Sequence, residues 1–325
     1  MMMYLQVIGG FIVLLVAAEA MVRGAVILAE KMGISPMVIG MTVVAFGTSA
    51  PELVVSLDAA LGGSAGLAIG NIVGSNIANV WLILGAACLV TPILAKPGAL
   101  KRDVAMLIGG SLLFVALCSL GELSLMAGIV LLIVFAGFIV TSYARGKGDP
   151  EVIKEQIEEL EELEKGIPKN VPVALLATVA GIIGLAFGAD LLVKGGAEIA
   201  QSFGVSDEVI GLTLFAFGTS LPELAASVVA AYRGHPDVAI GNVIGSNIFN
   251  MLLVGGVVAT VAGLPVPGQV LIFDNWVMLL AVAMLIPVLL GKMKLSRPYA
   301  GIFLVLYFAY VGSQTYGVER LLGAI

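Results

Sequence analysis

The chain has 325 residues, of which 60% are hydrophobic and only 12% are charged, and its mean hydropathy is +1.10. A soluble protein of this length would need far more charge to cover its surface, so the composition excludes a soluble globular domain and predicts an integral membrane protein that is solvated by the lipid bilayer. The net charge of -6 says little about partners, because much of the acid lies in one short segment, and nothing in the sequence indicates a nucleic-acid partner.

Ten apolar runs are long enough to cross about 30 Å of hydrocarbon, and each predicts a membrane-spanning helix. The first run has no basic region and no small-residue cleavage site, so we expect it to be retained and not removed as a signal peptide. The first five spans are expected near residues 5–30, 37–61, 66–90, 104–120 and 124–144. The other five are expected near residues 171–202, 208–232, 238–262, 274–291 and 299–318.

One strongly polar segment separates the two groups of spans. Its Ile153, Ile157, Leu160 and Leu163 recur at helical spacing among glutamates, which predicts a short helix outside the membrane. Such a helix could sense calcium, but a charge run is usually a solvated face, and we assign it no site. The expected organisation is a five-helix repeat, a cytoplasmic acidic linker and a second five-helix repeat, at residues 1–146, 147–170 and 171–325.

The two groups of spans are copies of each other. A constant shift of 171 residues aligns Glu19 with Asp190 and continues without a gap to Asn79 and Asn250. Within it, "MTVVAFGTSAPE" matches "LTLFAFGTSLPE" at 8 of 12 positions, and "AIGNIVGSNIAN" matches "AIGNVIGSNIFN" at 9 of 12. An odd number of spans makes the second copy enter the membrane from the opposite side. The predicted fold class is an all-α polytopic membrane protein with ten transmembrane helices in two inverted five-helix repeats.

Basic residues predict the orientation, because loops rich in Lys and Arg are cytoplasmic. All but three of the 16 Lys and Arg residues fall on one side: Arg320 falls on the other, and Arg23 and Lys194 lie within spans. We therefore expect a multi-pass protein of the cell membrane with both termini outside and the acidic linker in the cytoplasm.

The first repeated motif puts a proline and a glutamate inside an apolar span. Pro51 cannot continue a helix, so we expect the span to break into two half-helices, with Thr48 and Ser49 as capping residues. Glu52 then lies at the break, and Glu223 is its copy in the second half. An acidic side chain at this depth costs roughly 2.5 to 3.5 kcal/mol on insertion scales, and no basic residue recurs beside either glutamate.

These features predict a site for a hard cation. Helix-terminal carbonyls freed by each break, two carboxylates and nearby hydroxyls are all oxygen donors, and calcium fits such a flexible shell of about 6 to 8 oxygens better than magnesium does. The alternative is a proline kink with a protonated glutamate hydrogen-bonded across helices. The repetition of the motif argues against that alternative.

The second repeated motif places amides and a hydroxyl four residues apart, on one stripe of a helix. The stripe is Asn71, Ser75 and Asn79, and its copy is Asn242, Ser246 and Asn250. Gly70 and Gly74, with their copies Gly241 and Gly245, allow close helix packing, and the amides could serve the same interhelical contact. Their oxygens could also complete a cation shell. We expect Asn79 and Asn250 to be ligands, with a weaker case for Asn71 and Asn242.

Other polar residues predict less. Glu19 with Arg23, and Asp190 with Lys194, are spaced as ion pairs one helical turn apart. No pairing of a nucleophile with a base, no phosphate loop and no His-rich cluster is present, so we expect neither enzymatic activity nor a cofactor.

With "GTSAPEL" and "GTSLPEL" each followed by "GNIVGSN" or "GNVIGSN", both halves resemble the calcium/cation antiporter superfamily in its prokaryotic-type sodium/calcium exchanger branch, which has two alpha-repeats. The resemblance implies calcium ligands at the carboxylates of Glu52 and Glu223 and the backbone carbonyls of Thr48 and Thr219. For sodium it implies the oxygens of Ser49, Ser75, Asn79, Ser220, Ser246 and Asn250. It also implies that the long first and sixth spans slide as a gate. Potassium-dependent relatives carry an aspartate at the position of Asn250, which argues against potassium cotransport here.

The function predicted from these features is secondary-active antiport of calcium against sodium by alternating access at a midplane carboxylate site. Calcium and sodium are transported substrates, and the oligomeric state is not predicted. A proton/calcium exchanger is the alternative, although protonation of two acids would gain nothing from the surrounding neutral oxygens. A cation channel is a less favoured alternative, because inverted halves around a midplane site are typical of a carrier, and a structural scaffold is the last.

Overall fold

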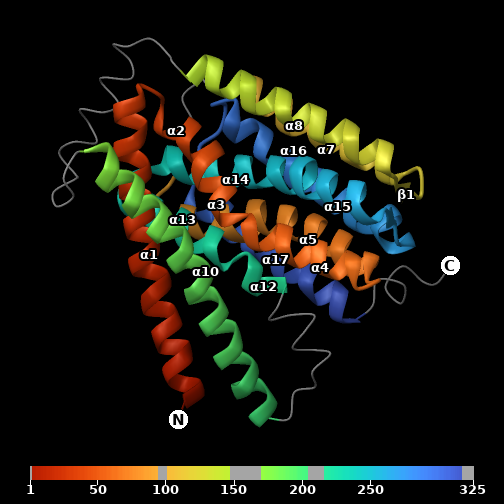
Figure 1. The fold of residues 1–325 in the computed structure, drawn as a ribbon, viewed down its shortest axis with the longest axis horizontal. Helices are drawn as coiled ribbons and strands as arrows, with labels where there is room; N and C mark the ends of the chain where they lie inside the picture. Colours follow the sequence, from red (N-terminus) through yellow and green to blue (C-terminus); the bar gives the residue numbers. More distant parts are fainter. Residues whose placement is uncertain (1, 94–100, 147–169, 204–215, 317–325) are drawn as a thin grey trace. The chain divides into compact units, whose positions relative to one another are not determined.

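The computed structural model describes residues 2–93, 101–146, 170–203 and 216–316 (Figure 1). The predicted acidic linker and the first part of the predicted span at 208–232 lie outside the described residues. The chain divides into two compact units, Met1–Pro51 with Thr141–Gly245, and Glu52–Val140 with Ser246–Ile325. Each unit therefore takes segments from both sequence repeats.

Within its described residues, the first unit consists of helices joined by short turns. Its helices are α1 (Met2–Met32), α2 (Pro36–Ile39), the π-helix η1 (Gly40–Val44), α3 (Ala45–Thr48), α10 (Val171–Ser202), α12 (Ala216–Thr219), α13 (Leu221–Tyr232) and most of α14 (Pro236–Ile248). Helix α10 starts at a capping residue, because Asn170 Oδ1 accepts a hydrogen bond from the Val173 amide at 2.9 Å, and a proline follows in the first turn.

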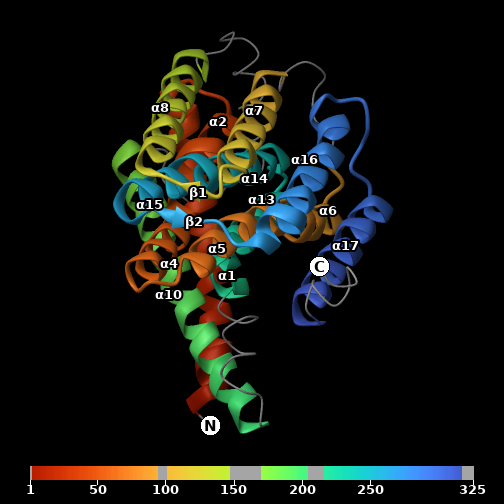
Figure 2. The ribbon, with the colours of Figure 1, turned by 90° about the vertical axis from the view of Figure 1, so that its right-hand side faces the viewer.

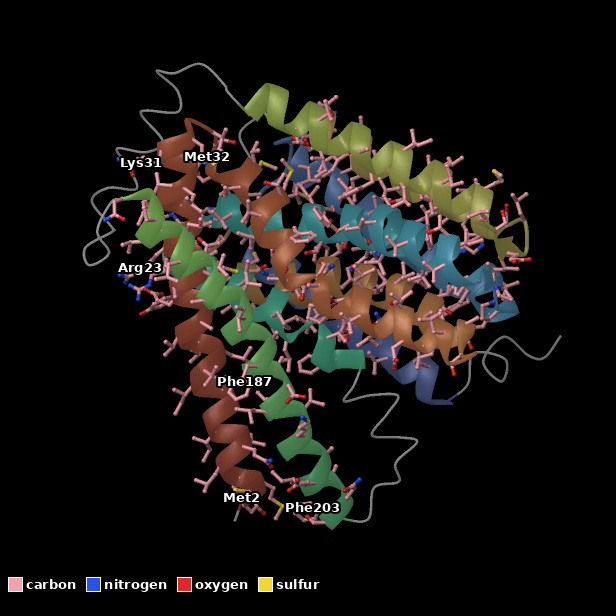
Figure 3. The ribbon with its side chains drawn as sticks, in the orientation of Figure 1. Met2, Arg23, Lys31, Met32, Phe187 and Phe203 are labelled. Atoms are coloured by element: carbon pink, nitrogen blue, oxygen red, sulfur yellow. The ribbon has the colours of Figure 1, made fainter. Side chains whose placement is uncertain are left out.

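The two long helices α1 and α10 lie side by side and run antiparallel (Figures 1 and 3). A Cβ placed at Gly10 would lie 2.7 Å from the backbone nitrogen of Leu192. A Cβ placed at Gly181 would lie 2.6 Å from the backbone nitrogen of Met21. The shift of 171 residues exchanges these two contacts, so α1 and α10 pack around a local two-fold axis. Figure 3 shows Met2 of α1 beside Phe203 at the end of α10, as an inverted repeat requires.

The second unit holds the remaining helices and one pair of two-residue strands. Its elements are α4 (Ala50–Leu61), α5 (Ala65–Ala78), η2 (Asn79–Ile83), α6 (Leu84–Val90), α7 (Lys101–Cys118), β1 (Glu122–Leu123), α8 (Leu125–Gly146), η4 (Phe249–Val254), α15 (Gly255–Ala262), β2 (Leu264–Pro265), η5 (Val270–Asp274), α16 (Asn275–Leu289) and α17 (Arg297–Tyr316). The unit boundaries fall within α4, α8 and α14. The antiparallel strands β1 and β2 join the α7–α8 loop to the α15–α16 loop (Figure 2).

Within the second unit, α5, η2 and α6 form one continuous apolar rod, Ala65–Val90, which is mostly buried. Helix α8 is mostly exposed along its apolar length, as a lipid-facing helix would be. Among the described residues, six helices are long and apolar enough to cross a membrane, and the bent pair Pro36–Thr48 and Ala50–Leu61 makes a seventh if it counts as one span.

Candidate functional site

The predicted break in the second span is present, and the second repeat has the same break. Helix α3 ends at Thr48 and α4 begins at Ala50, with Ser49 between them at φ -85° and ψ 3°. In the second repeat, Ser220 has φ -86° and ψ 1° between α12 and α13. The proline that follows lacks an N–H, so its own position adds no unpaired donor to the first turn of the new helix.

Both glutamates lie in the first turn of the helix that follows the break, Glu52 in α4 and Glu223 in α13. Each side chain is only 1% exposed. A helix N-terminus favours a negative charge, which offsets part of the cost of burying a carboxylate. The fold therefore buries two acids at matched positions of the two repeats, as the sequence predicts.

Thr48 and Ser49 were expected as capping residues, and Ser49 is the C-cap residue of α3. Ser220 makes no side-chain capping bond, and the Ser49 hydroxyl instead donates to Oε1 of Glu223 at 3.0 Å. Within the first unit, the break of one repeat therefore touches the carboxylate of the other. A hydrogen bond to a carboxylate is stronger than a bond to a backbone amide, which explains why the hydroxyl turns away from the helix end.

A second contact joins the two repeats in the first unit. The Thr48 hydroxyl lies 3.2 Å from Oδ1 of Asn242 on α14. Close packing of α14 on α2 and η1 makes this possible, since a Cβ at Gly241 or Gly245 would lie 2.5 Å from the carbonyl oxygens of Met37 and Met41, respectively. The predicted packing role of these two glycines is confirmed. At Gly70 and Gly74 no atom of the described residues comes that near.

The first amide of each polar stripe binds the helix that carries the glutamate. Asn71 Nδ2 donates to Ser56 Oγ at 2.9 Å and to the Glu52 carbonyl at 3.4 Å, within the second unit. In the first unit, Asn242 Nδ2 makes the same two contacts. The sequence analysis missed Ser56 and its copy Ser227. The sequence does contain a signal for them, because a serine follows each glutamate by four residues and the two serines are related by the same shift of 171 residues.

The other predicted oxygen ligands of the second unit are Ser75, Asn79, Ser246 and Asn250, all buried. Among the described residues, the amides of Asn79 and Asn250 and the hydroxyl of Ser246 find no hydrogen-bond partner. Leaving such a group unpaired costs about 1 to 3 kcal/mol, so these atoms need a partner beyond the described residues, and a bound cation would supply one to the oxygens. Asn79 opens η2 and Asn250 lies in η4, and π-helical turns are frequent at functional sites.

The ten predicted site residues divide equally between the two units. The first unit holds Thr48, Ser49, Thr219, Ser220 and Glu223, and the second holds Glu52, Ser75, Asn79, Ser246 and Asn250. That the five residues of each unit come together in one cation site stays a prediction. No group of three or more His, Cys, Asp or Glu side chains gathers within the described ranges, so any cation held here needs neutral oxygens as well.

The two predicted ion pairs within helices are present, Arg23 with Glu19 on α1 and Lys194 with Asp190 on α10. Arg23 lies toward the Met32 end of α1 (Figure 3). Glu19 also accepts a hydrogen bond from Arg233 Nε at 2.7 Å, which ties α1 to the end of α13. Because these side chains are partly exposed, each ion pair contributes at most about 1 kcal/mol to helix packing, and the Glu19 carboxylate is already paired.

Comparison with known proteins agrees with this geometry. The model of the family described as "Sodium/calcium exchanger protein" matches residues 2–144 and 173–316. CaxA of Alkalimonas amylolytica is 39% identical over 317 residues, which cover 95% of this chain and 96% of CaxA. The sodium/calcium exchanger MaX1 of Methanosarcina acetivorans is 32% identical over 341 residues, which cover 94% of this chain and 96% of MaX1.

Solved structures show the same fold. One structure of the sodium-calcium exchanger NCX_Mj, soaked with 2.5 mM Na+ and 0.1 mM Ca2+, matches with a TM-score of 0.82 at 31% identity and covers 96% of this chain and 98% of that chain. The predicted fold class is confirmed: the chain is an all-helical polytopic membrane protein with about ten transmembrane helices in two repeats.

Proposed function

Because the chain belongs to the sodium/calcium exchanger protein family, as its paired motifs predicted, we propose that it is a secondary-active antiporter that exchanges calcium for sodium by alternating access. It is a multi-pass membrane transporter and not an enzyme. The observation that carries the proposal is the contact between the repeats: the Ser49 hydroxyl of the first motif lies 3.0 Å from the Glu223 carboxylate of the second.

In the proposed site, Glu52 and Glu223 together balance the charge of one calcium ion. The backbone carbonyls of Thr48 and Thr219 supply further oxygens from the helix ends at the two breaks, where carbonyls carry partial negative charge. Calcium suits this arrangement because it accepts a flexible shell of carboxylate and carbonyl oxygens. The burial of both acids, each 1% exposed, supports this role, since a bound cation would offset the cost of burying them.

Sodium is the proposed countersubstrate, held by Ser49, Ser75, Asn79, Ser220, Ser246 and Asn250. The buried amides of Asn79 and Asn250 have no hydrogen-bond partner among the described residues, which supports the use of neutral oxygens for a monovalent cation. Because calcium and sodium compete for one shared site, binding of one excludes the other, and their opposite fluxes are coupled. The matched structure of NCX_Mj was soaked with Na+ and Ca2+, the two ions proposed as substrates here.

A flux assay in proteoliposomes tests the proposal. Vesicles loaded with calcium should release it when an inward sodium gradient is applied at equal pH on both sides and without potassium. Release driven only by an inward proton gradient, with sodium inert, would establish the proton/calcium exchanger instead. Calcium flux that ignores any opposing gradient would establish a channel.

We further propose that both termini lie outside the cell and that the acidic linker is cytoplasmic, following the distribution of Lys and Arg. The two native cysteines, Cys88 and Cys118, are buried, so single cysteines can be added to the native chain and labelled. In intact cells, a membrane-impermeant thiol reagent should label Ser124→Cys, in the α7–α8 loop, and should leave Glu161→Cys in the linker unlabelled. The reverse pattern would invert the topology.

A further inference from the structure

The two asparagines that open the polar stripes make identical contacts in the two repeats. Nδ2 of Asn71 lies 2.9 Å from Ser56 Oγ and 3.4 Å from the Glu52 carbonyl oxygen. Nδ2 of Asn242 lies 2.9 Å from Ser227 Oγ and 3.4 Å from the Glu223 carbonyl oxygen. The same pair of contacts occurs in both repeats, although Asn71 lies in one compact unit and Asn242 in the other, so the repeated sequence produces the arrangement twice.

The chemistry of these contacts fixes the direction of each amide. A backbone carbonyl only accepts hydrogen bonds, so the amide nitrogen, and not the amide oxygen, must face the glutamate-bearing helix. Both N–H groups of the amide are then engaged, one by the carbonyl and one by the serine. The oxygen of Asn242 is engaged as well, because the Thr48 hydroxyl donates to it at 3.2 Å. A cation at Asn242 would therefore have to share the amide oxygen with the Thr48 hydroxyl.

The contacts fall where the helix is least restrained. The first turn of α4 or α13 begins directly after a break, and its N–H groups have no partner within the helix. A glutamate and the serine four residues later lie on the same face of the helix. An asparagine that donates hydrogen bonds to both the glutamate carbonyl and this serine hydroxyl therefore fixes the rotation of the turn about the helix axis. The rotation of the turn in turn sets the direction of the glutamate carboxylate.

We propose that Asn71 and Asn242 are positioning residues, which hold the glutamate-bearing turns of α4 and α13 in place and do not bind the transported cation. Asn242 positions a second element as well, because its Oδ1 accepts a hydrogen bond from Thr48 at the end of α3. This proposal rests on the proposed function, since it takes Glu52 and Glu223 as the cation-binding carboxylates. It replaces the weaker expectation that these two asparagines are ligands.

The serines provide the decisive test, because Ser227 touches the asparagine and is not a predicted ligand. A positioning role predicts that Ser227→Ala and Asn242→Ala each weaken calcium affinity by roughly 10- to 100-fold, as loss of a partner that orients a ligand does. It also predicts that the double variant is little worse than Asn242→Ala alone, because both changes break one linkage. Ser227→Thr keeps the hydroxyl and should restore most of the affinity.

Two further variants sharpen the comparison. Asn242→Asp removes the N–H donors and adds an anionic oxygen, so it should weaken calcium binding if the amide nitrogen matters, whereas a ligand role predicts equal or tighter binding. Ser111→Ala is the matched control, because Ser111 is a fully buried serine whose hydroxyl donates to the Leu107 carbonyl of its own helix at 2.7 Å and is not a predicted site residue. It should leave calcium affinity unchanged.

Calcium affinity is measured on the full chain in two ways: the calcium concentration that half-saturates sodium-driven exchange, and the rise in melting temperature that calcium causes in detergent. If Asn242→Ala does not fold, the Ser227→Ala and Ser227→Thr pair decides the matter alone. Normal calcium affinity in Ser227→Ala, or retained affinity in Asn242→Asp, would overturn the positioning role while wild-type exchange stands. A wild-type protein that exchanges no calcium would instead overturn the proposed function, and the positioning role with it.

Discussion

Replacing the Glu223 carboxylate by the amide of glutamine tests the proposed site most directly. The change keeps the size of a side chain that is only 1% exposed, and its Oε1 can still meet the Ser49 hydroxyl, which lies 3.0 Å away. What is removed is one negative charge from a buried position. We therefore expect Glu223→Gln to fold normally and to lose calcium transport.

The expected size of the effect follows from the charges. A carboxylate about 4 Å from a divalent cation gains about 8 kcal/mol at an effective dielectric constant of about 20, twice the value for two unit charges. Removing the carboxylate also removes a burial cost of roughly 2.5 to 3.5 kcal/mol. The net loss is about 5 kcal/mol, which corresponds to a calcium affinity more than about 1,000-fold weaker. Without calcium, the melting temperature should be equal to that of the wild type or higher, because a buried charge has gone.

The assay is sodium-driven calcium release from proteoliposomes, with the melting temperature in calcium-free detergent measured in parallel. Glu122→Gln is the matched control, because Glu122 is an exposed acid of β1 and should lose neither transport nor stability. Glu52→Gln should behave like Glu223→Gln. Wild-type exchange rates in both single variants would refute the carboxylate site. A large fall in the melting temperature would show that the buried charge is needed for folding, and would refute the expectation that it serves only cation binding.

Three further predictions concern other parts of the molecule. Replacing Asn79 and Asn250 together by Ala should weaken the sodium dependence of exchange while the carboxylates keep some calcium affinity, and an unchanged sodium dependence would remove both amides from the site. Exchange should proceed without potassium and gain nothing from added potassium, because Asn250 is neutral, and stimulation by potassium in the flux assay would contradict this. Gly10→Ala should lower the melting temperature by an amount equivalent to about 1 to 3 kcal/mol, because its Cβ would lie 2.7 Å from the Leu192 nitrogen, whereas Gly9→Ala, with open space around it, should not.

The sequence alone was sufficient for the helices, the breaks and the repeat. The predicted span at 171–202 agrees with α10, and the span predicted at 37–61 agrees with α2 to α4. Lipid leaves no alternative to internal backbone hydrogen bonds, so an apolar run of sufficient length must be a helix, and a proline within it must break it. The repeat shift then predicted a two-fold relation, which the contacts of Gly10 and Gly181 bear out.

Only the tertiary structure decided which hydrogen-bond partner each polar side chain of the site has. The spacing of Asn71, Ser75 and Asn79 places them on one stripe, but it does not say that the Asn71 nitrogen faces a carbonyl while the Asn79 amide finds no partner among the described residues. Likewise, the Ser49 hydroxyl could have capped its own helix, and it binds Glu223 only because the fold brings residues 174 positions apart within 3.0 Å. The π-helical turns were also invisible in the sequence, because one extra residue in a turn leaves the composition of a uniformly apolar span unchanged. Periodicity specifies the face of a helix on which a side chain lies, whereas its hydrogen-bond partner depends on which segment the packing sets opposite that face.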